Sequence, residues 1–270
     1  MNIDFEAYKE GGQESAFLFH YTTRKVALRY ILVEGRLKFS TRKKSHDPLE
    51  KEAVAFTAQT MTMADPGLVQ EDLEYRLRFG TLINQARNHT KYACFSVDKS
   101  PIAHNPWNKG CFRSRMWSQY AESHKGICLV FDKKKLLTEV KKHLRPFPGH
   151  FLLSGKIAYA NKVQGMAEAA HFTPGRALDS PVSFLKENAQ SFLFSKIKDY
   201  EQEQEFRVAF YNSLRGPDLV SIEDSLAGIV VGQYCDDASF DEISQMAKRL
   251  RVPVATAFWF RGQPSFAGRS

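Results

Sequence analysis

The chain has few cysteines, and their spacing argues against the sites that cysteines usually build. No two of them form a C-x-x-C pair, so a zinc knuckle is not favoured, and a disulfide framework is not expected in a chain of 270 residues. Three lie among apolar or aromatic residues, which indicates buried free thiols in a reducing compartment. A chain of this length can bury a sizeable core without cross-links. The four cysteines are Cys94, Cys111, Cys128 and Cys235.

The sequence also lacks long apolar runs, repeats and low-complexity linkers. No run approaches the roughly 20 residues that span a bilayer, and the polar start MNIDFEAYKE does not resemble a signal peptide. We therefore expect a cytoplasmic protein that does not bind membranes. The absence of linkers predicts a single α+β domain over residues 1–270, which could carry a surface insertion at residues 160–195.

The chain carries an excess of positive charge. The formal net charge is +8, which favours polyanionic partners or anionic small molecules such as nucleotides. A basic surface without a specific partner is the alternative. Hydrophobic residues make up 43% and charged residues 25%, as in folded soluble proteins, so disorder is not expected.

The predicted elements mix strands and helices without a strict β-α-β alternation. This order favours an α+β fold with a mixed, largely antiparallel sheet flanked by helices. Strands are predicted at Ala16–His20, Leu37–Ser40, Tyr92–Val97, Ile127–Phe131, Phe151–Tyr159, Phe206–Tyr211, Gly228–Val231 and Val252–Phe260. Helices are predicted at Arg24–Glu34, Pro48–Thr60, Leu68–Asn88, Arg113–His124, Lys133–His143, Val182–Lys196 and Phe240–Leu250. Gly35 and Gly126 follow two of these helices, where a left-handed residue often ends a helix.

A histidine ends the first apolar run, at the point where a helix is predicted to begin. The run Ala16–Phe19 leads directly into His20, Tyr21 and Thr22. Thr22 or Thr23 can cap the helix, and a helix N-terminus suits an anion or the polar edge of a nucleotide. The alternative is that His20 and Tyr21 only satisfy local hydrogen bonds, and the residues alone favour it.

A short basic run follows the second predicted strand. Arg42, Lys43 and Lys44 could contact phosphate, although such a run is more often a solvated surface. His46 and Asp47 as metal ligands would need a partner that the spacing does not supply. Asp47 precedes a proline and is explained by helix capping.

The helix predicted over residues 113–124 carries aromatic and imidazole groups on one broad face. Packing of this face on the sheet is the default explanation. Buried Tyr120 and His124 would need partners for their polar tips, so the face could instead line a cleft. The face consists of Met116, Trp117, Tyr120, Ala121 and His124.

The segment EQEFR, residues 203–207, combines two carboxylates with a guanidinium. As a strand, it would point Glu203, Glu205 and Arg207 to one side, either as an exposed row of paired charges or as the wall of a cleft. In a cleft, one carboxylate can stabilise positive charge while its neighbour acts as a base. A competing assignment makes residues 196–205 a helix and scatters the three charges.

Taken together, these segments resemble a bacterial family known as domain of unknown function 2971. Its pattern runs from His-Tyr-Thr through Asp-Pro-x-Glu and C-F-S to M-W-x-x-Y-A-x-x-H-x-G and E-x-E-x-R. Tyr200 and Gln202 depart from it, where a tryptophan and an aromatic residue are usual. The matching residues are His20-Tyr21-Thr22, Ile31-Leu32 with Gly35, Leu37 and Ser40, Asp47-Pro48 with Glu50, Cys94-Phe95-Ser96, Met116-Trp117 with Tyr120, Ala121, His124 and Gly126, and Glu203, Glu205 and Arg207.

The order of His, Ser and a late carboxylate is more distantly similar to the ADP-ribosyltransferase superfamily. This resemblance implies a split sheet that grips NAD as a substrate, and a bacterial defence or toxin effector that modifies protein or nucleic acid. It implies that Glu205 is the main catalytic carboxylate and that Glu203 assists the acceptor. The residues implied to bind NAD are His20, Tyr21, Thr22, Ser40, Ser96, Trp117, Tyr120, His124 and Arg207.

The resemblance implies a separate role for each of several residues. His20 and Thr22 would hold the adenosine ribose or the nicotinamide amide, and Ser96 would support Glu205 or the nicotinamide ribose. Tyr120 would lie beside the nicotinamide, and Arg207 would orient a carboxylate or contact phosphate.

Two alternatives from other classes remain. One is a non-catalytic module that binds a nucleotide or nucleic acid in the same cleft. The other is a metal-dependent hydrolase or nuclease, which is less favoured because no local ligand spacing is present, and no metal is expected.

Overall fold

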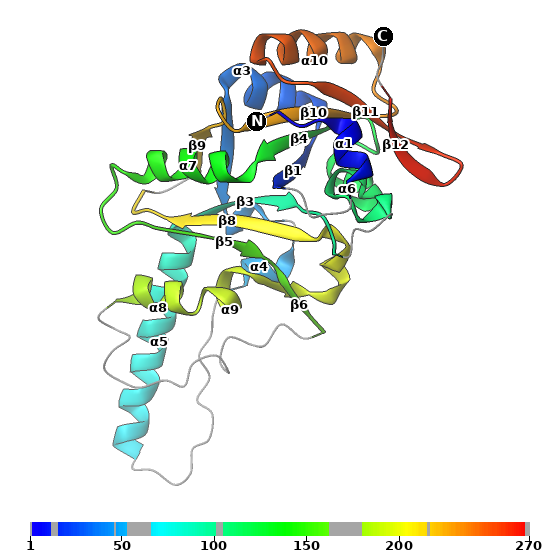
Figure 1. Cartoon of the computed structure of the whole chain (residues 1–270). Helices are drawn as coiled ribbons and strands as arrows, with labels where there is room; N and C mark the ends of the chain where they lie inside the picture. Colours follow the sequence, from blue (N-terminus) through cyan, green and yellow to red (C-terminus); the bar gives the residue numbers. More distant parts are fainter. Residues whose placement is uncertain are drawn as a thin grey trace.

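The computed structural model describes residues 2–11, 16–45, 47–52, 66–100, 105–161, 180–214 and 217–267. Its main feature is an open sheet flanked by helices (Figure 1). The strands of this sheet are β1 (Phe17–Thr22), β2 (Arg36–Thr41), β3 (Thr90–Ser96), β4 (Ile127–Asp132), β5 (Phe151–Lys156), β8 (Glu205–Tyr211), β9 (Asp218–Ser221), β10 (Leu226–Gly232), β11 (Val254–Phe260) and β12 (Gln263–Ala267). A separate parallel pair consists of β6 (Ala158–Ala160) and β7 (Ser195–Ile197).

The helices vary widely in length. The α-helical segments are α1 (Phe5–Glu10), α2 (Arg24–Val26), α3 (Leu32–Glu34), α4 (Pro48–Lys51), α5 (Pro66–His89), α6 (Ser114–Tyr120), α7 (Lys133–Leu144), α8 (Pro181–Glu187), α9 (Ala189–Leu193) and α10 (Asp237–Leu250). The π-helical turn is η1 (Ala27–Ile31), and the 3₁₀ helices are η2 (Arg42–Lys44), η3 (Pro106–Asn108), η4 (Gly110–Phe112) and η5 (Lys198–Glu203). Among the helices described, none has the length and apolar character needed to cross a membrane.

The sheet is mixed but largely antiparallel. Its strand order is β12-β11-β10-β4-β1-β3-β2-β9, and β8 pairs with both β3 and β5. Within the described sheet, the pair of β10 and β11 is parallel and the other pairs are antiparallel. The predicted α+β architecture with a mixed, largely antiparallel sheet is therefore confirmed.

The sheet divides along one edge of β3. The other edge of β3 pairs with β8 along its whole length, from Thr90 to Ser96. On the divided edge, β1 pairs only at Ser96, and β2 pairs only at Lys91 and Tyr92. No described strand pairs with residues 93–95 on this edge, so β1 and β2 leave a gap between them.

The half of the sheet around β4 is buried on both faces. Leu129 and Phe131 belong to a cluster with side chains of α7 and α10, whereas Cys128 and Val130 belong to a cluster with side chains of α1 and α6. Strands that are buried on both faces have continuous apolar runs instead of an alternating pattern. This explains the strand correctly predicted at Ile127–Phe131.

A third cluster covers the half formed by β3, β8 and β5. Phe79 and Ile83 of α5 and Leu185 of α8 pack there with Ala209 of β8 and Phe151 of β5. The first turns of α5 extend well beyond the sheet (Figure 1). The cluster therefore uses the C-terminal part of α5, together with α8 and α9.

The first predicted helix, Arg24–Glu34, is confirmed, with the π-helical turn η1 in its middle. Thr23, one of the two predicted caps, accepts a hydrogen bond from the backbone N–H of Val26 at 3.2 Å. Gly35 ends the helix with a φ of 62°, a conformation that glycine adopts without a Cβ clash.

The helix predicted over Arg113–His124 is wrong in its last four residues. Helix α6 ends at Tyr120, and the chain then passes through three consecutive left-handed residues that end at His124, with a φ of 69°. A right-handed helix cannot continue through such residues. Gly126 is not left-handed, contrary to our expectation. A Cβ there would lie 2.6 Å from the carbonyl oxygen of Thr22, so the glycine permits a close approach to β1.

Two other predictions missed a break. The strand predicted over Phe151–Tyr159 is divided into β5 and β6 at Ile157, whose N–H donates to the carbonyl of Glu205. The helix predicted over Val182–Lys196 ends at Leu193, and its last residues form β7 instead. Elements α1, β9 and β12 were not predicted.

Parts of two predictions lie outside the described residues. The helix predicted from Pro48 is observed as α4, and its predicted continuation over residues 53–60 is outside. The predicted surface insertion is described only at its ends, because residues 162–179 are outside as well.

Candidate functional site

A pocket of about 240 Å³ lies where the sheet divides. Residues 93–95 of β3, which no strand covers on this edge, form part of its lining. The other walls come from β1, β2, Glu50 of α4, α6 and the segment from β7 to β8. The predicted site residues that line this pocket are His20, Tyr21, Ser40, Ser96, Tyr120, Glu203 and Glu205.

His20 occupies the gap in the pairing of β3. Its Nδ1 lies 3.0 Å from the carbonyl oxygen of Cys94, in the stretch that neither β1 nor β2 reaches. A carbonyl can only accept, so Nδ1 carries the proton and Nε2 remains an acceptor. Burial lowers the pKa of His20 more than the Cys94 carbonyl raises it, so the imidazole is neutral at pH 7.

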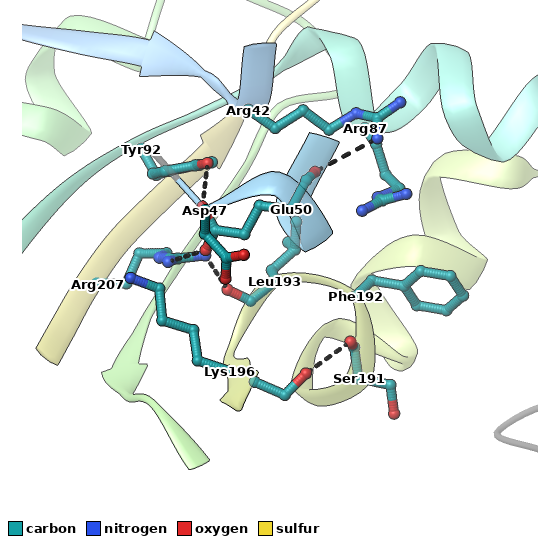
Figure 2. Close-up of a pocket in the computed structure, with 11 residues that line it drawn as sticks. Arg42, Asp47, Glu50, Arg87, Tyr92, Ser191, Phe192, Leu193, Lys196 and Arg207 are labelled. Atoms are coloured by element: carbon teal, nitrogen blue, oxygen red, sulfur yellow. Dashed lines mark hydrogen bonds and ion pairs between the residues drawn. The ribbon is translucent and has the colours of Figure 1, made fainter. Parts of the chain in front are cut away.

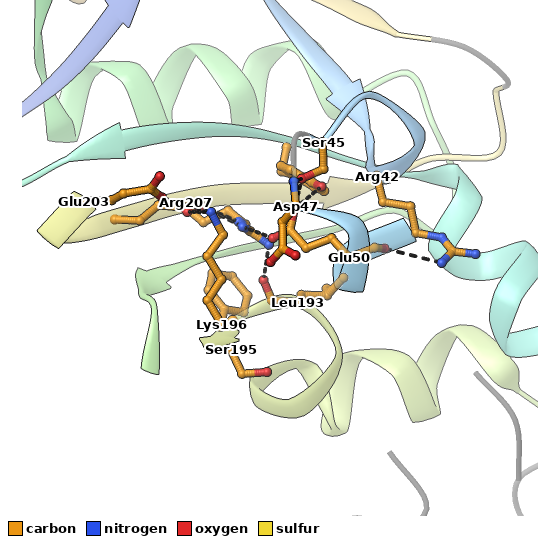
Figure 3. A network of polar contacts seen from close by, with 12 residues as sticks. Arg42, Ser45, Asp47, Glu50, Leu193, Ser195, Lys196, Glu203 and Arg207 are labelled. Carbon is orange, nitrogen blue, oxygen red and sulfur yellow. Dashed lines mark hydrogen bonds and ion pairs between the residues drawn. The ribbon is translucent and has the colours of Figure 1, made fainter. Parts of the chain in front are cut away.

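An ionic network borders the pocket (Figure 3), and its members Glu50, Lys196, Glu203 and Glu205 line it. The Nζ atom of Lys196 lies 3.0 Å from Oε2 of Glu203 and 2.6 Å from Oε2 of Glu205. The Nη2 atom of Arg207 lies 2.7 Å from Oε1 of Glu205 and 2.5 Å from Oε1 of Glu50. Three carboxylates therefore share two cations, which leaves one formal negative charge in excess.

The members of this network keep one another ionised. Burial alone would raise the pKa of Glu205, but Arg207 and Lys196 outweigh it and lower this pKa to about 2. At Glu50, too, burial alone would raise the pKa, but Arg207 and Lys196 outweigh burial and lower this pKa. The carboxylates in turn raise the pKa of Lys196 and of Arg207 against the effect of burial. The described residues include no group of three or more His, Cys, Asp or Glu side chains placed to hold a metal ion.

Glu203 and Glu205 reach the network from two kinds of backbone. Glu203 ends the 3₁₀ helix η5, Gln204 has a φ of 44°, and β8 begins at Glu205. The helix and the strand that competed as predictions for this segment both occur, joined by one left-handed residue. The hydroxyl of Ser96 donates to the carbonyl oxygen of Glu203 at 2.9 Å and holds the junction. Both carboxylates consequently converge on Lys196.

Aromatic rings supply much of the remaining lining. The hydroxyl of Tyr120 donates to Oε1 of Glu203 at 2.9 Å. Burial and Glu203 both raise the pKa of Tyr120, so its hydroxyl stays a donor. Tyr21, Tyr92 and Phe95 line the same pocket. Flat aromatic faces of this kind can stack a heterocyclic ring.

Four residues predicted to bind NAD do not line this pocket: Thr22, Trp117, His124 and Arg207. Thr22 is buried at the end of β1, opposite Ile127 of β4. Trp117 is fully buried, and its Nε1 donates to the carbonyl of Cys111 at 2.8 Å. His124 stacks on Trp117 at the turn after α6. The helix face that we expected to line a cleft therefore contributes Met116 and Tyr120 to the pocket, while Trp117 fills the core.

Arg207 also lies outside the main pocket and lines a smaller one, of about 50 Å³ (Figure 2). Its guanidinium is buried, with the ring of Tyr92 at 4.4 Å. Its position between Glu50 and Glu205 is that of a residue that orients carboxylates, which was one of its two predicted roles.

Sequence reasoning did not select Lys196, Glu50 or Tyr92 for the site. A signal for Lys196 was available, because buried carboxylates need a cation and this lysine lies only seven residues before Glu203. Its assignment to a helix end concealed it. Glu50 was noted only within the Asp-Pro-x-Glu pattern. The hydroxyl of Tyr92 donates to Glu50, a contact that nothing in the local sequence indicates.

A family model matches the middle of the chain. Residues 116–208 match the family described as "Protein of unknown function (DUF2971)". This match supports the resemblance to the DUF2971 family that the sequence motifs indicated. The matched DUF2971 segment contains Tyr120, Lys196, Glu203, Glu205 and Arg207, but not the strands that carry His20 and Ser96. No curated protein and no solved structure matches the chain.

Proposed function

We propose that the chain is an ADP-ribosyltransferase-like enzyme that consumes NAD in the pocket at the divided edge of β3. One observation carries the proposal: His20, Ser96, Tyr120 and Glu205 line a single pocket although they come from distant segments of the chain. These are residues that the resemblance to the superfamily implied. The acceptor in this proposal is a nucleophile on protein or nucleic acid.

The proposed reaction breaks the bond between nicotinamide and ribose C1. Nicotinamide leaves as a neutral molecule with the bonding electron pair, and the ribose becomes oxocarbenium-like. The acceptor then bonds to C1 and loses a proton. A fixed negative charge beside C1 stabilises the cation in the transition state.

Glu205 has the charge for the stabilising role. Its pKa of about 2 keeps it anionic at neutral pH and makes it a poor base. Deprotonation of the acceptor therefore falls to Glu203 in this proposal. A carboxylate has about four lone-pair positions, so Glu205 can accept a ribose hydroxyl while it is paired with Lys196 and Arg207.

The remaining lining suits the polar and flat parts of the substrate. The Nε2 acceptor of His20 can take a hydrogen bond from the nicotinamide amide or from a ribose hydroxyl. Tyr120 can stack beside the nicotinamide, as the resemblance implied. Thr22 has no part in this arrangement, because it does not line the pocket.

The test is to incubate the purified chain with NAD and candidate protein or nucleic-acid acceptors and to measure nicotinamide release. Glu205→Gln is expected to lower the rate by about 100-fold or more. Glu187→Gln, the same change on an exposed residue of α8, should leave the rate unchanged. Circular dichroism checks that Glu205→Gln is folded, and Tyr120→Phe offers a second variant that keeps the ionic network intact. No release with any acceptor, together with no thermal shift by NAD, would contradict the proposal.

A non-catalytic binding module is the second candidate. The observation that favours it is that Glu203 and Glu205 are both already bonded to Lys196, so they could serve only to shape the pocket. A thermal shift with NAD or RNA, without nicotinamide release in the presence of any acceptor, would support this candidate over the enzyme.

A further inference from the structure

Two buried arginines lie side by side in the wall of the smaller pocket (Figure 2). Arg42 is 8% exposed and Arg87 is 4% exposed. The carbonyl oxygen of Glu52 accepts a hydrogen bond from Nη1 of both arginines. Oδ1 of Asn84 also accepts from both, through Nη2 of Arg42 and Nη1 of Arg87. Two shared acceptors place the guanidinium groups next to each other.

In the part of the chain that the structure describes, the hydrogen-bond partners of this pair are neutral. They are the carbonyl oxygens of Glu50, Lys51 and Glu52 and the side-chain oxygens of Asn84 and Asn88. Among the described residues, neither arginine forms an ion pair, even with the acidic Asp47 and Glu50 that line the same pocket. Glu50 is instead paired with Arg207. Two adjacent buried cations that no described carboxylate contacts directly are costly, although Glu50 lies near enough to raise the pKa of Arg87.

The electrostatics of the pair agree with this geometry. Burial lowers the pKa of Arg42. Burial and then the neighbouring Arg42 lower the pKa of Arg87 to about 10. An anion bound between the two guanidinium groups would remove their mutual repulsion.

The described residues leave the best binding edge of Arg87 unused. A guanidinium binds a carboxylate or phosphate with two parallel hydrogen bonds from one edge. The hydrogen bonds of Arg87 to described residues come from Nη1. Its Nε is buried and has no partner, which is an unfavourable state for a donor. The edge formed by Nε and Nη2 therefore remains for a ligand.

We propose that Arg42 and Arg87 form a binding site for a phosphate-class oxyanion, held by the Nε and Nη2 edge of Arg87. The pocket of about 50 Å³ exceeds the roughly 10–15 Å³ that one water needs and suits a phosphate group better than a whole nucleotide. Inorganic phosphate and the terminal phosphate of a nucleotide share this chemistry. The proposal does not depend on the consumption of NAD.

Calorimetric titration of the full chain with sodium phosphate, against sodium chloride of equal ionic strength, tests this site. We expect saturable binding to one site. Arg87→Gln should weaken it by about tenfold or more, because a charge-assisted contact is lost. Arg87→Lys keeps the charge but cannot form the bidentate pair of hydrogen bonds, so it should also weaken phosphate binding. Arg36→Gln, on the exposed side of β2, is the matched control and should bind as the wild type does.

Titrations with AMP and adenosine distinguish the two sources of the anion. Tighter binding of AMP than of phosphate, with the gain lost in Arg87→Gln, indicates a nucleotide phosphate. Equal or weaker binding of AMP indicates inorganic phosphate. Either result supports the site.

Phosphate binding that is absent, non-saturable or equal in the wild type and Arg87→Lys would overturn the proposed site. Nicotinamide release is a separate readout, so failure of the anion site and failure of the proposed enzyme are distinguishable.

Discussion

Two buried ionic clusters in this sheet each pair a lysine with carboxylate groups. One lies away from both pockets and the other lines them. Lys91 of β3 is fully buried, and its Nζ contacts Oδ1 of Asn212, the carbonyl of Leu214 and Oδ2 of Asp218. These three acceptors match the three N–H donors of an ammonium group. The cluster around Lys91 lines neither of the two pockets described above. Lys196, by contrast, belongs to the lining of both.

The difference shows which buried charges indicate a site. Around Lys91, the three ammonium donors have three acceptors, one of them the Asp218 carboxylate, and His143 lies on the other side of that carboxylate. Around Lys196, three carboxylates share two cations, and the excess charge is next to a pocket. An ionisable network beside a cavity is a candidate site with a physical rationale, which is why the proposed function uses the cluster around Lys196.

We call the cluster around Lys91 the sealed cluster, because it lines neither pocket. Breaking it should have the largest effect on stability. Lys91→Met leaves Asp218 buried without its cation, and we expect a loss of about 3–5 kcal/mol in the free energy of unfolding. Urea denaturation measures this loss. Lys141→Met, an exposed lysine of α7, should change stability by no more than about 0.5 kcal/mol. A loss below about 1 kcal/mol in Lys91→Met would contradict the expected cost of breaking this cluster.

We call the cluster around Lys196 the open cluster, because it lines both pockets. Its contribution to the stability of the fold should depend on pH. The folded-state pKa of Glu205 is lowered from 4.5 to about 2. Its ionisation therefore stabilises the fold by about 3 kcal/mol above pH 4.5, and this contribution is lost as the pH falls toward 2. Glu205→Gln should be less stable than the wild type at pH 7, and the gap should shrink at pH 3. A gap that is independent of pH would contradict the ionised state of Glu205.

Removing the shared cation of the open cluster should cost less stability than removing Lys91. Lys196→Met leaves Glu203 and Glu205 beside a pocket that water can enter, and we expect a loss of about 2 kcal/mol. Under the proposed function, NAD should produce no thermal shift in this variant but should still produce one in Lys91→Met, compared at temperatures where each is folded. Equal losses of stability at Lys91 and Lys196 would remove the distinction between the clusters.

The smallest effect is expected at the gap in β3. His20→Phe leaves the carbonyl of Cys94 without its hydrogen bond, which should cost about 1 kcal/mol. Thr23→Ala removes the helix cap at a similar cost, about 1 kcal/mol, but lies outside the pocket lining. Titration with NAD should show weaker binding for His20→Phe and unchanged binding for Thr23→Ala. Weaker binding in both variants would indicate a general loss of structure.

The apolar patterns of the chain were enough to predict most of the sheet. Ile127–Phe131 and Gly228–Val231 are continuous apolar runs because their strands are buried on both faces. Asp218–Ser221 was missed because a four-residue strand with one exposed leucine has too few residues to show a period. The end of α6 was missed because three ordinary residues, not a glycine, adopt the left-handed conformation there.

The candidate site was predictable where it depended on motifs and not where it depended on distant partners. Glu203 and Glu205 attracted attention as neighbouring carboxylates, and both line the pocket. Arg42 and Arg87 are far apart in the sequence, and no local pattern brings them together. Their proximity arises because α5 passes beside the segment that follows β2.

The sequence by itself determined the class of the fold, the chemical types at the site and a helix cap at Thr22 or Thr23, because each depends on residues close together in the chain. Only the tertiary structure decided what His20 does. Strands β1 and β2 meet opposite ends of one edge of β3, and this leaves a carbonyl for His20 to bind and a pocket beside it. The pairing of Glu205 with two cations also depends on long-range contacts. Such contacts follow from the packing of whole elements, so no short window of sequence contains them.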